Sequence, residues 1–493
     1  MRTILISLDS LNRHFLKLYN PLEGMDLPHL QALAAAGVVF DSHFTGSAPC
    51  MPARREFMTG RLELMHREWG PLEAFDRPLS QRLKAVNCPT MLVTDHYHLF
   101  EVGGENYHVD FTGYELLRGH ENDNWKTHDV DLPELNPHSH TNANQERNRA
   151  MFRTRADFPT ARTFAAARTW AQENATTKDF FLFIDEFDPH EPFFAPQEYL
   201  DAFDDSGYDG PRLEWPNYGD WQGTEQELQH IRNRYRAKVK FLDDEVGAFI
   251  KLLQDKGMYE ETTIILTTDH GHYLGEHGEI GKPRCDNWNT LFHIPMVVKP
   301  AASLGCETGG RRVTALTTTA DIPATILELH GLELEAHYYG QSFLPLLQGT
   351  AEKTRDYVLY GYFGDQMGYC DGTHTYLKSP KPDGPLYYYS NTLSTHPGRT
   401  QWLRDAYAGT TDCERGPWIP GSDYPVMRWR LPAPPLRQHM GGLLDNVLYA
   451  YPADLEQRDD IADAELVAQY QEAMRAAMRE QQFPAEHYER LGL

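Results

Sequence analysis

Short apolar runs recur along the first two thirds of the chain and predict buried strands. Residues 3–8 (TILISL), 180–184 (FFLFI) and 262–268 (TTIILTT) each end just before an aspartate. Runs of this length are typical of parallel strands in a sheet that is covered on both faces. Two shorter runs, at residues 38–40 and 89–94, predict further strands of the same kind.

Helical periodicity lies between these runs. It is clearest at residues 225–256, where apolar side chains recur at alternating steps of three and four residues. Gly257 is a suitable end for this helix. A coiled-coil partner is conceivable, but a helix that packs one face on the core is far commoner. Weaker patterns predict helices at residues 27–36 and 160–174.

The alternation of strands and helices up to about residue 350 predicts an α/β domain with a doubly wound sheet flanked by helices. Beyond that point Pro, Gly, Tyr and Trp become frequent, and short antiparallel strands are expected at residues 357–362, 373–378 and 386–390. We therefore expect a main domain over residues 1–350 and a smaller α+β subdomain over residues 351–493. Its terminal helix is predicted at residues 463–480.

The segment from residue 100 to residue 148 lacks clear periodicity and is rich in His, Asn, Asp and Gly. We interpret it as a long surface excursion. Such excursions in compact domains are usually functional or mobile.

The composition of the chain limits the classes of partner that it is expected to bind. Its 493 residues include 41% hydrophobic and 12% aromatic side chains, which is typical of a folded globular protein. The 46 Lys and Arg residues against 71 Asp and Glu residues give a formal charge of −25. This charge argues against nucleic acid or an anionic membrane as the main partner. Any anion site must be built locally from metal, Arg, Lys and His.

The cysteines indicate a reduced compartment. They show no C-x-x-C pair and no even spacing, so neither a zinc site nor a disulfide framework is predicted. Residues 3–8 are too short for the apolar part of a signal peptide, and no stretch approaches the length of a transmembrane helix. We expect a cytoplasmic protein without a membrane partner.

The stretch from Gly46 to Arg61 (GSAPCMPARREFMTGR) is not ordinary turn sequence. Pro52 can begin a helix at no cost in hydrogen bonds, which would place Cys50 at or just before a helix N-terminus. Free N–H groups and the helix dipole favour an anion there, and Arg54 lies one turn further on. A nucleophile at this point could attack a sulfate or phosphate ester. The simpler interpretation is a small buried cysteine beside a helix start.

The C-x-P-x-R core at Cys50, followed by Thr59-Gly60-Arg61, resembles the signature of the type I sulfatases of the alkaline phosphatase superfamily. Ala53 stands where serine or alanine is usual in that family. There the cysteine is oxidised to formylglycine by a formylglycine-generating enzyme, and the hydrated aldehyde is the nucleophile. The resemblance therefore implies an alkaline-phosphatase-like mixed sheet and this modification.

The same resemblance implies one divalent metal ion. Its ligands here would be Asp9, the modified Cys50, Asp269 and His270. Oxygen donors with one imidazole suit Ca²⁺, Mn²⁺ or Mg²⁺ better than a structural zinc ion, and Ca²⁺ is our first expectation. Ser10 stands where the family commonly has a second aspartate and is a further candidate.

Four more side chains are assigned by resemblance. The segment at residues 268–278, followed by Gly-Lys, is similar to the sulfatase segment whose lysine reaches the sulfate, here Lys282. The DPHEPF segment around His190 resembles one that carries a histidine close to the leaving group. His98 keeps a family position, whereas His96 stands where the family usually has lysine. From His96 we expect weaker, pH-dependent anion binding.

These residues imply a sulfatase that hydrolyses an aryl or carbohydrate sulfate ester to an alcohol and sulfate. Arg54 and Lys282 would hold the sulfate oxygens. His190 would protonate the leaving alcohol, with Lys282 as a second donor, and His98 would be the base for the release of sulfate.

Two alternatives stay open. A phosphonate monoester or phosphodiester hydrolase of the same superfamily would share the formylglycine and the metal. A protein that only binds sulfated glycans would keep an unconverted thiol at Cys50. Trp402, Trp418 and Trp429 could stack on sugars or aryl groups, but such residues more often pack in the core. The long C-terminal region is a plausible contact surface for a homo-oligomer.

Overall fold

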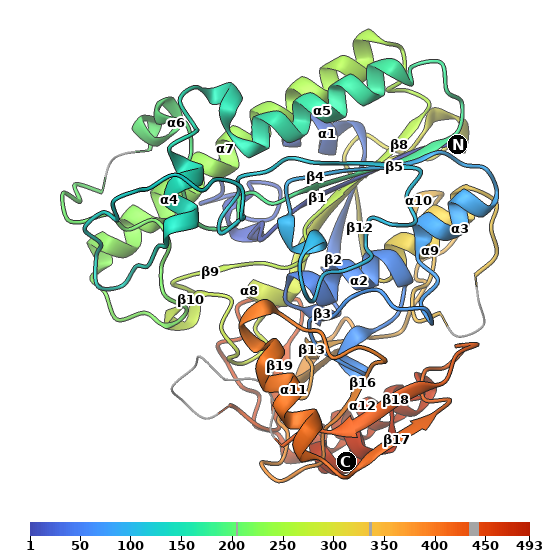
Figure 1. Ribbon diagram of the computed structural model, residues 1–493. Coiled ribbons are helices and arrows are strands. Elements are labelled where there is room, and N and C mark those ends of the chain that lie inside the picture. Colours follow the sequence, from blue (N-terminus) through green and yellow to red (C-terminus); the bar gives the residue numbers. More distant parts are fainter. Residues whose placement is uncertain (204–205, 335–337, 433–442) are drawn as a thin grey trace.

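A computed structural model describes residues 1–203, 206–334, 338–432 and 443–493. A mixed sheet runs through its centre (Figure 1), and its strands in spatial order are β12 (Arg311–Thr318), β2 (Val38–Phe44), β11 (His293–Lys299), β8 (Thr262–Thr267), β1 (Arg2–Leu8), β6 (Phe180–Glu186), β4 (Thr90–Thr94) and β5 (Gly113–Leu116). Strand β11 is antiparallel to both of its neighbours, and the other pairs are parallel. The predicted doubly wound mixed sheet is therefore confirmed.

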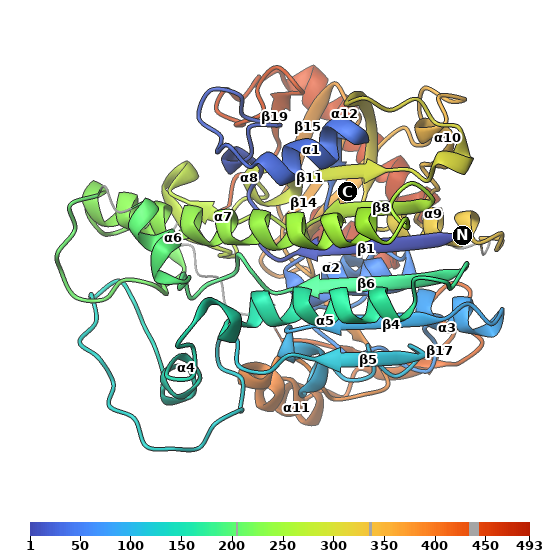
Figure 2. The ribbon, with the colours of Figure 1, turned by 90° about the horizontal axis from the view of Figure 1, so that it is seen from above.

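Two layers of helices cover the faces of this sheet, one on each side of it in Figure 1, and Figure 2 looks down on one of them. Strand β1 shows why, because it is buried on both sides: Ile4 and Ile6 belong to one apolar cluster and Leu5 to another. The first cluster includes side chains of α1 (Pro28–Ala36), α5 (Pro159–Glu173) and α7 (Glu225–Asp255). The second includes side chains of α2 (Cys50–Thr59), α3 (Leu79–Ala85), α9 (Asp321–Leu329) and α10 (Leu344–Leu347).

Helix α7 begins at a capping box in which Thr224 and Glu227 satisfy each other's backbone N–H groups. Its side chain Phe249 is fully buried and meets Phe164 of α5 with ring centroids 6.4 Å apart. We expect Phe249→Ala to lower the free energy of unfolding by about 3–5 kcal/mol, because it removes a large core side chain. Denaturant titration measures this loss.

The matched control for that substitution is Lys251→Ala on the same helix. The Lys251 side chain is 71% exposed, and its ion pair with Asp255 is a surface contact. We expect a change within about 0.5 kcal/mol. Equal losses for the two variants would contradict the packing of α7 on the core.

The C-terminal part adds a second, five-stranded sheet. Its strands in order are β19 (Val447–Ala450), β15 (His374–Lys378), β14 (Met367–Cys370), β13 (Val358–Tyr362) and β3 (Ser47–Ala48). The antiparallel pairs β13–β14, β14–β15 and β15–β19 confirm the expected antiparallel sheet. Strand β3 joins β13 in parallel and ends two residues before Cys50. The C-terminal sheet therefore supports the loop that leads to Cys50, and the division at residue 350 stays a prediction.

The remaining C-terminal elements form a small sheet and three helices. The sheet contains β16 (Tyr387–Tyr389), β18 (Val426–Arg430) and β17 (Cys413–Gly416). The helices are α11 (Thr400–Gly409), α12 (Ala464–Glu480) and α13 (Ala485–Leu491). Helix α12 corresponds to the terminal helix predicted from the sequence.

The excursion at residues 100–148 has more structure than its sequence indicates. It contains the edge strand β5 and most of α4 (Ala143–Arg149). The alternation in β5 is weak because Tyr114 and Glu115 are both exposed.

Several short elements complete the fold. A sheet near the loops of the site contains β7 (Gly219–Asp220), β10 (Glu279–Gly281) and β9 (Tyr273–Leu274). Two short α-helices are α6 (Gln197–Ala202) and α8 (Asn289–Phe292). The 3-10 helices are η1 (Arg13–Phe15), η2 (Glu63–Met65), η3 (Tyr97–Phe100), η4 (Arg155–Asp157), η5 (Glu276–Gly278), η6 (Ala302–Leu304) and η7 (Pro397–Arg399). Within the described ranges, no helix combines the length and the apolar character needed to cross a bilayer.

Candidate active site

Three aspartates from separate strands meet at the carboxyl edge of the sheet. Asp9 directly follows β1, Asp185 lies near the end of β6, and Asp269 follows β8 after one residue. The strands are in register, with Ser7 of β1 opposite Asp185. Because carboxyl ends of parallel strands share one edge, residues far apart in sequence converge there. Cys50 approaches the same edge as the first residue of α2.

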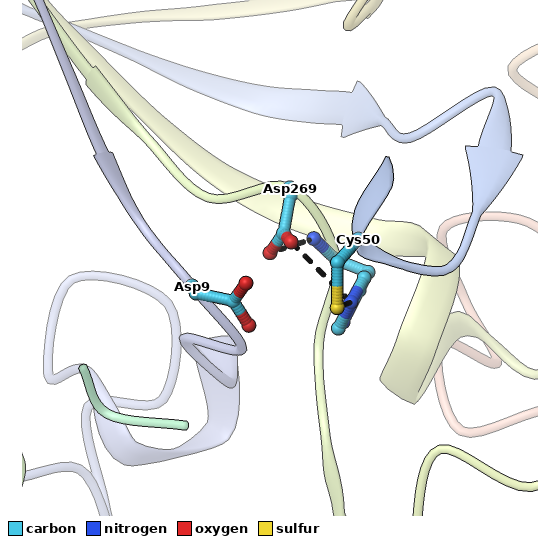
Figure 3. A group of neighbouring side chains, drawn as sticks. Asp9, Cys50 and Asp269 are labelled. Atoms are coloured by element: carbon cyan, nitrogen blue, oxygen red, sulfur yellow. Dashed lines mark hydrogen bonds and ion pairs between the residues drawn. The ribbon is translucent and has the colours of Figure 1, made fainter. Parts of the chain in front are cut away.

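The four predicted metal ligands lie together. Asp9, Cys50, Asp269 and His270 each offer one donor atom, and these atoms all lie within 4.8 Å of one another (Figure 3). Sγ of Cys50 is 3.2 Å from Nε2 of His270. Oδ1 of Asp269 accepts the backbone N–H groups of His270 at 2.8 Å and Ser10 at 3.0 Å. These bonds fix the carboxylate, which turns its other oxygen toward Arg54.

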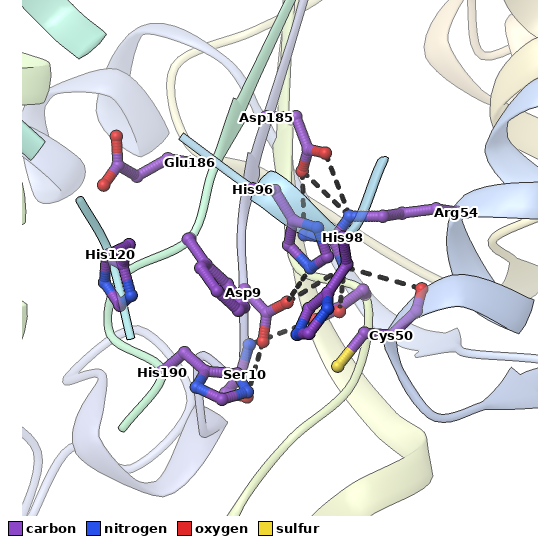
Figure 4. Close-up of polar contacts among 12 residues, drawn as sticks. Asp9, Ser10, Cys50, Arg54, His96, His98, His120, Asp185, Glu186 and His190 are labelled. Atoms are coloured by element: carbon purple, nitrogen blue, oxygen red, sulfur yellow. Dashed lines mark hydrogen bonds and ion pairs between the residues drawn. The ribbon is translucent and has the colours of Figure 1, made fainter. Parts of the chain in front are cut away.

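Arg54 is surrounded by carboxylates (Figure 4). Its Nε and Nη2 donate to the two oxygens of Asp185 at 2.9 and 2.8 Å. Its Nη1 lies 2.9 Å from Oδ2 of Asp9 and 2.5 Å from Oδ2 of Asp269. Burial alone would raise the pKa of Asp9, but Arg54 and Lys282 outweigh it, so the pKa lies below its ordinary value and Asp9 is ionised.

Three buried carboxylates around one guanidinium favour a further cation. Lys282 is a further positive group that acts on Asp9. Two carboxylates and an imidazole, each with a donor atom within 4.8 Å of that of Cys50, are a donor set that suits a hard divalent ion. The residues present therefore fit the metal that the resemblance implies.

A cavity of about 730 Å³ opens beside this cluster. Four of the predicted site residues line it: Cys50, His98, His190 and Lys282. Its other lining side chains are mainly aromatic, cationic or carboxylate groups, including Trp69, Trp215, Tyr218, Tyr362, Arg284, Arg399 and Glu121. This volume is in the range of pockets that hold small organic ligands.

Arg54 and His96 are absent from the described lining of this cavity. Arg54, expected to hold sulfate oxygens, instead holds the three carboxylates. His96 is fully buried, with Nε2 3.4 Å from Oδ2 of Asp9 and its ring 4.1 Å from that of Phe187. Burial and Arg54 keep the pKa of His96 well below its ordinary value, which favours the neutral ring. The weak, pH-dependent binding of the anion by His96 stays a prediction.

Ser10 connects the metal cluster to Lys282. Its hydroxyl donates to Oδ1 of Asp9 at 2.7 Å and accepts from Nζ of Lys282 at 3.4 Å. Ser10 has a φ of 66°, which is uncommon for a residue with a side chain. Ser10 therefore lies directly beside the donor cluster, and its part in holding the ion stays a prediction.

The two cavity histidines differ in protonation. Nδ1 of His190 lies 2.6 Å from the backbone oxygen of Glu191, which can only accept, so Nδ1 carries a proton. Burial and Lys282 hold the pKa of His190 well below its ordinary value. His98 is the opposite case, since burial lowers its pKa but Glu101 and Glu121 raise it to about 9.

Sequence reasoning missed several contributing residues. Asp185 directly follows an apolar run in the sequence, as Asp9 and Asp269 do, but the sequence analysis assigns it no part in the site. Glu101 and Glu121 lie in the aperiodic excursion, where no pattern marks them. The aromatic residues of the cavity are also unexpected ones. The tryptophans named in the sequence lie elsewhere: Trp429 is 1% exposed in an apolar cluster of the C-terminal part, and Trp402 packs against that cluster.

The family model named Sulfatase matches residues 2–332 of the chain. The chain belongs to the sulfatase family. The matched span includes all the predicted site residues, from Asp9 to Lys282. The resemblance of the cysteine motif is therefore confirmed at the level of the family and of its superfamily.

The names of the relatives of this sulfatase give different activities. It is 25% identical over 381 residues to the multifunctional alkaline phosphatase superfamily protein PehA of Trinickia caryophylli, covering 65% of this chain and 71% of that one. It is 24% identical over 392 residues to the choline-sulfatase of Rhizobium meliloti (strain 1021), covering 72% and 73%. Among solved structures, the phosphonate monoester hydrolase of Agrobacterium radiobacter superposes with a TM-score of 0.68 at 19% identity, covering 97% and 96% of the two chains. This last likeness shows the fold alone.

Proposed function

We propose that this sulfatase hydrolyses a sulfate ester to an alcohol and inorganic sulfate. The main support is that the donor atoms of Cys50, Asp9, Asp269 and His270 lie within 4.8 Å of one another, and that Cys50 and Lys282 both line the cavity. A cysteine at the start of a helix, beside a donor set for a divalent ion, is the arrangement that the family chemistry requires. The choline-sulfatase among the relatives is consistent with this reaction.

The proposal includes one divalent ion and the conversion of Cys50 to formylglycine. Asp9, Asp269, His270 and residue 50 would hold the ion, with Ca²⁺ as the first candidate and Mn²⁺ or Mg²⁺ as alternatives. When bound, the ion would act as a Lewis acid on the reacting oxygens and offset the excess carboxylate charge. Once converted, residue 50 would supply a hydrated aldehyde as nucleophile and a second hydroxyl that allows sulfate to leave.

The unconverted thiol is a poor substitute for that group. Burial and Asp9 raise the pKa of Cys50 well above its ordinary value, so the thiol stays protonated. We therefore include a formylglycine-generating enzyme as the maturation partner. The cytoplasmic location expected from the cysteines stays a prediction.

Lys282, Arg54 and the aromatic side chains of the cavity would have different roles in substrate binding. Lys282, buried and charged because the carboxylates of Glu191 and Asp9 oppose the effect of burial on its pKa, would hold a sulfate oxygen. Arg54 would keep the carboxylates of Asp9 and Asp269 in place through its own bond to Asp185. The aromatic walls of the cavity suit an aryl or sugar leaving group.

The choice between sulfate and phosphonate is open to direct measurement. With para-nitrophenyl sulfate and the para-nitrophenyl ester of phenylphosphonate as paired substrates, we expect kcat/KM to be at least about tenfold higher for the sulfate, a difference of about 1.4 kcal/mol. The two esters share one leaving group, so the comparison isolates the transferred group.

A higher kcat/KM for the phosphonate ester would favour a phosphonate monoester hydrolase, which is the activity named for one structural neighbour. Turnover of neither ester, together with a raised melting temperature on addition of a sulfated glycan, would favour a binding protein. Mass spectrometry of the peptide that contains Cys50 separates the last outcome from failed maturation of the sample.

A further inference from the structure

We propose that the substrate carries a second anionic group, a carboxylate or a further sulfate on its alcohol part, and that Arg399 together with Arg284 forms the subsite for this group. The inference rests on the proposed hydrolysis of a sulfate ester and narrows its substrate class. It also gives the C-terminal part of the chain, which contains Arg399, a role in the choice of substrate.

Glu68 holds both arginines at one point of the cavity wall. Its Oε2 accepts from Nη2 of Arg284 at 3.1 Å and from Nη1 of Arg399 at 2.9 Å. Glu68 is 3% exposed, whereas both arginines line the cavity. Because one carboxylate oxygen serves two guanidinium groups, their positive charges lie close together and repel each other. A second anion at this point would reduce that repulsion.

Arg284 already has several partners within the protein. Its Nη1 donates to the backbone oxygen of Phe363 at 3.3 Å and lies 3.6 Å from Oδ2 of Asp365. Its guanidinium group lies 5.1 Å from the centre of the Tyr362 ring. Arg284 therefore contributes mainly its charge and a fixed position.

Arg399 keeps donors for a ligand. Within the described part of the chain it bonds to Glu68 alone, through Nη1, and its side chain is 31% exposed. Its Nε and Nη2 are the same pair of donors with which Arg54 holds both oxygens of Asp185. This edge of a guanidinium group matches the two oxygens of a carboxylate or of a sulfate.

The segment that carries Arg399 is fixed to the main part of the chain. Oγ of Ser394 accepts from the N–H of Gly103 at 2.9 Å, and Oγ1 of Thr395 donates to Oε1 of Glu68 at 3.2 Å. A Cβ atom at Gly103 would lie 2.3 Å from the backbone oxygen of Thr395, so the two segments touch through their backbones. Arg399 is thus held in place before a ligand arrives, which lowers the entropic cost of binding.

The subsite is separate from the place expected for the reacting sulfate. Nζ of Lys282 points to the donor cluster, since it lies 3.4 Å from the hydroxyl of Ser10. Among the described residues, neither Arg284 nor Arg399 forms an ion pair or hydrogen bond with that cluster. Tyr362 lies between the two places, because its hydroxyl donates to the backbone oxygen of Lys282 at 3.4 Å and its ring faces Arg284.

The charge of the cavity favours a substrate with more than one negative group. Lys282, Arg284 and Arg399 line it, whereas Glu121 is the only carboxylate in its described lining. The formal charge of the whole chain is −25, so this surface differs in sign from the average of the molecule. Burial lowers the pKa of Arg399 and Arg284 acts in the same direction, although Glu68 opposes them. An anion bound here would stabilise the charged form of Arg399.

Matched aryl sulfates test the subsite. The meta- and para-carboxyphenyl sulfates are compared with the carbamoylphenyl sulfates, which keep the shape of the substituent but lack its charge. We expect kcat/KM to be about tenfold or more higher for the acid than for the amide at one of the two positions, because the acid adds charge-assisted hydrogen bonds. Sulfophenyl and sulfamoylphenyl sulfates form a second set, and the set with the larger ratio identifies the preferred anion.

Three variants test the residue. In Arg399→Gln the ratio of acid to amide should fall to about one, because the charge and the two-donor edge are both lost. Arg399→Lys should keep part of the ratio, since it retains the charge alone. Arg404→Gln is the control, because this exposed arginine on α11 is outside the cavity and should leave the ratio unchanged.

Equal values for charged and uncharged esters in both sets would overturn the subsite. An unchanged ratio in Arg399→Gln, including an equal loss for acid and amide, would mean that Arg399 has only a structural role. If that variant does not fold, Arg399→Lys decides in the same way. Turnover of none of these sulfates by the converted, unaltered enzyme would instead contradict the proposed function.

Discussion

Cys50→Ala is expected to lower kcat for para-nitrophenyl sulfate by about three orders of magnitude or more, which is the scale seen when an enzyme loses its nucleophile. Cys50 is the first residue of α2, is 3% exposed and lies in the donor cluster with Asp9 and Asp269. Alanine fits this space without a cavity of any size, so folding should be retained. Steady-state kinetics and a thermal melt together separate loss of activity from loss of structure.

Cys50→Ser sharpens the test, provided that mass spectrometry shows the serine to be unconverted. A serine hydroxyl could take the sulfate, but it lacks the second hydroxyl that would expel it, so water would have to cleave the ester. We expect at most one equivalent of nitrophenol per enzyme, followed by arrest. Sustained turnover by this variant would contradict the need for a hydrated aldehyde at residue 50.

Cys306→Ser is the matched control for both variants. Cys306 is a partly buried cysteine in the loop before β12, outside the cavity and the donor cluster. The activity of the Cys306→Ser variant should equal that of the unaltered enzyme. Full activity of Cys50→Ala would rule out residue 50 as the nucleophile. An unconverted thiol in a sample that turns over many times would instead contradict the need for formylglycine.

The sheet was predictable because its strands follow from short-range patterns, whereas the set of four donor residues was implied by the resemblance of the cysteine motif. Strands β1 and β8 are apolar runs that end at Asp9 and Asp269, and parallel strands bring such ends to one edge. Helix α7 was predicted as residues 225–256 and is observed at Glu225–Asp255, because its apolar period and cap are local. Strand β5 was not predicted, because it is a short edge strand with exposed side chains and therefore has no clear apolar pattern.

The roles of individual side chains were less predictable because they depend on partners from distant segments. Arg54 has the spacing of an anion ligand, yet the carboxylates that bind it come from three different strands. His98 and His190 look alike in sequence. They differ because Glu121 approaches one and the backbone oxygen of Glu191 binds the other. These contacts arise only in the folded chain, and no periodicity in the sequence indicates them.

The second large effect is expected at the metal cluster. Asp269→Asn keeps the shape of the side chain but removes one of the charges around Arg54 that favour a divalent ion. We expect loss of bound metal and a fall in kcat of about 100-fold or more, because a Lewis acid supplies several kcal/mol of stabilisation in the transition state. Treatment of the unaltered enzyme with a chelator should have the same effect, and Ca²⁺, Mn²⁺ and Mg²⁺ added singly would identify the ion that restores activity.

Binding can be measured independently of turnover. A ligand present at 100 times its dissociation constant stabilises the folded state by about 2.7 kcal/mol, so the metal should raise the melting temperature of the unaltered protein. Asp269→Asn should lose this shift, whereas Asp26→Asn, at a side chain that is 77% exposed and paired with Lys17, should keep it. If Asp269→Asn binds metal with unchanged stoichiometry, the ion lies elsewhere, and the charge around Arg54 must be balanced by protonation of one carboxylate. Asp185 is the carboxylate to examine in that case, because burial raises its pKa to about 6 even with Arg54 bound to it.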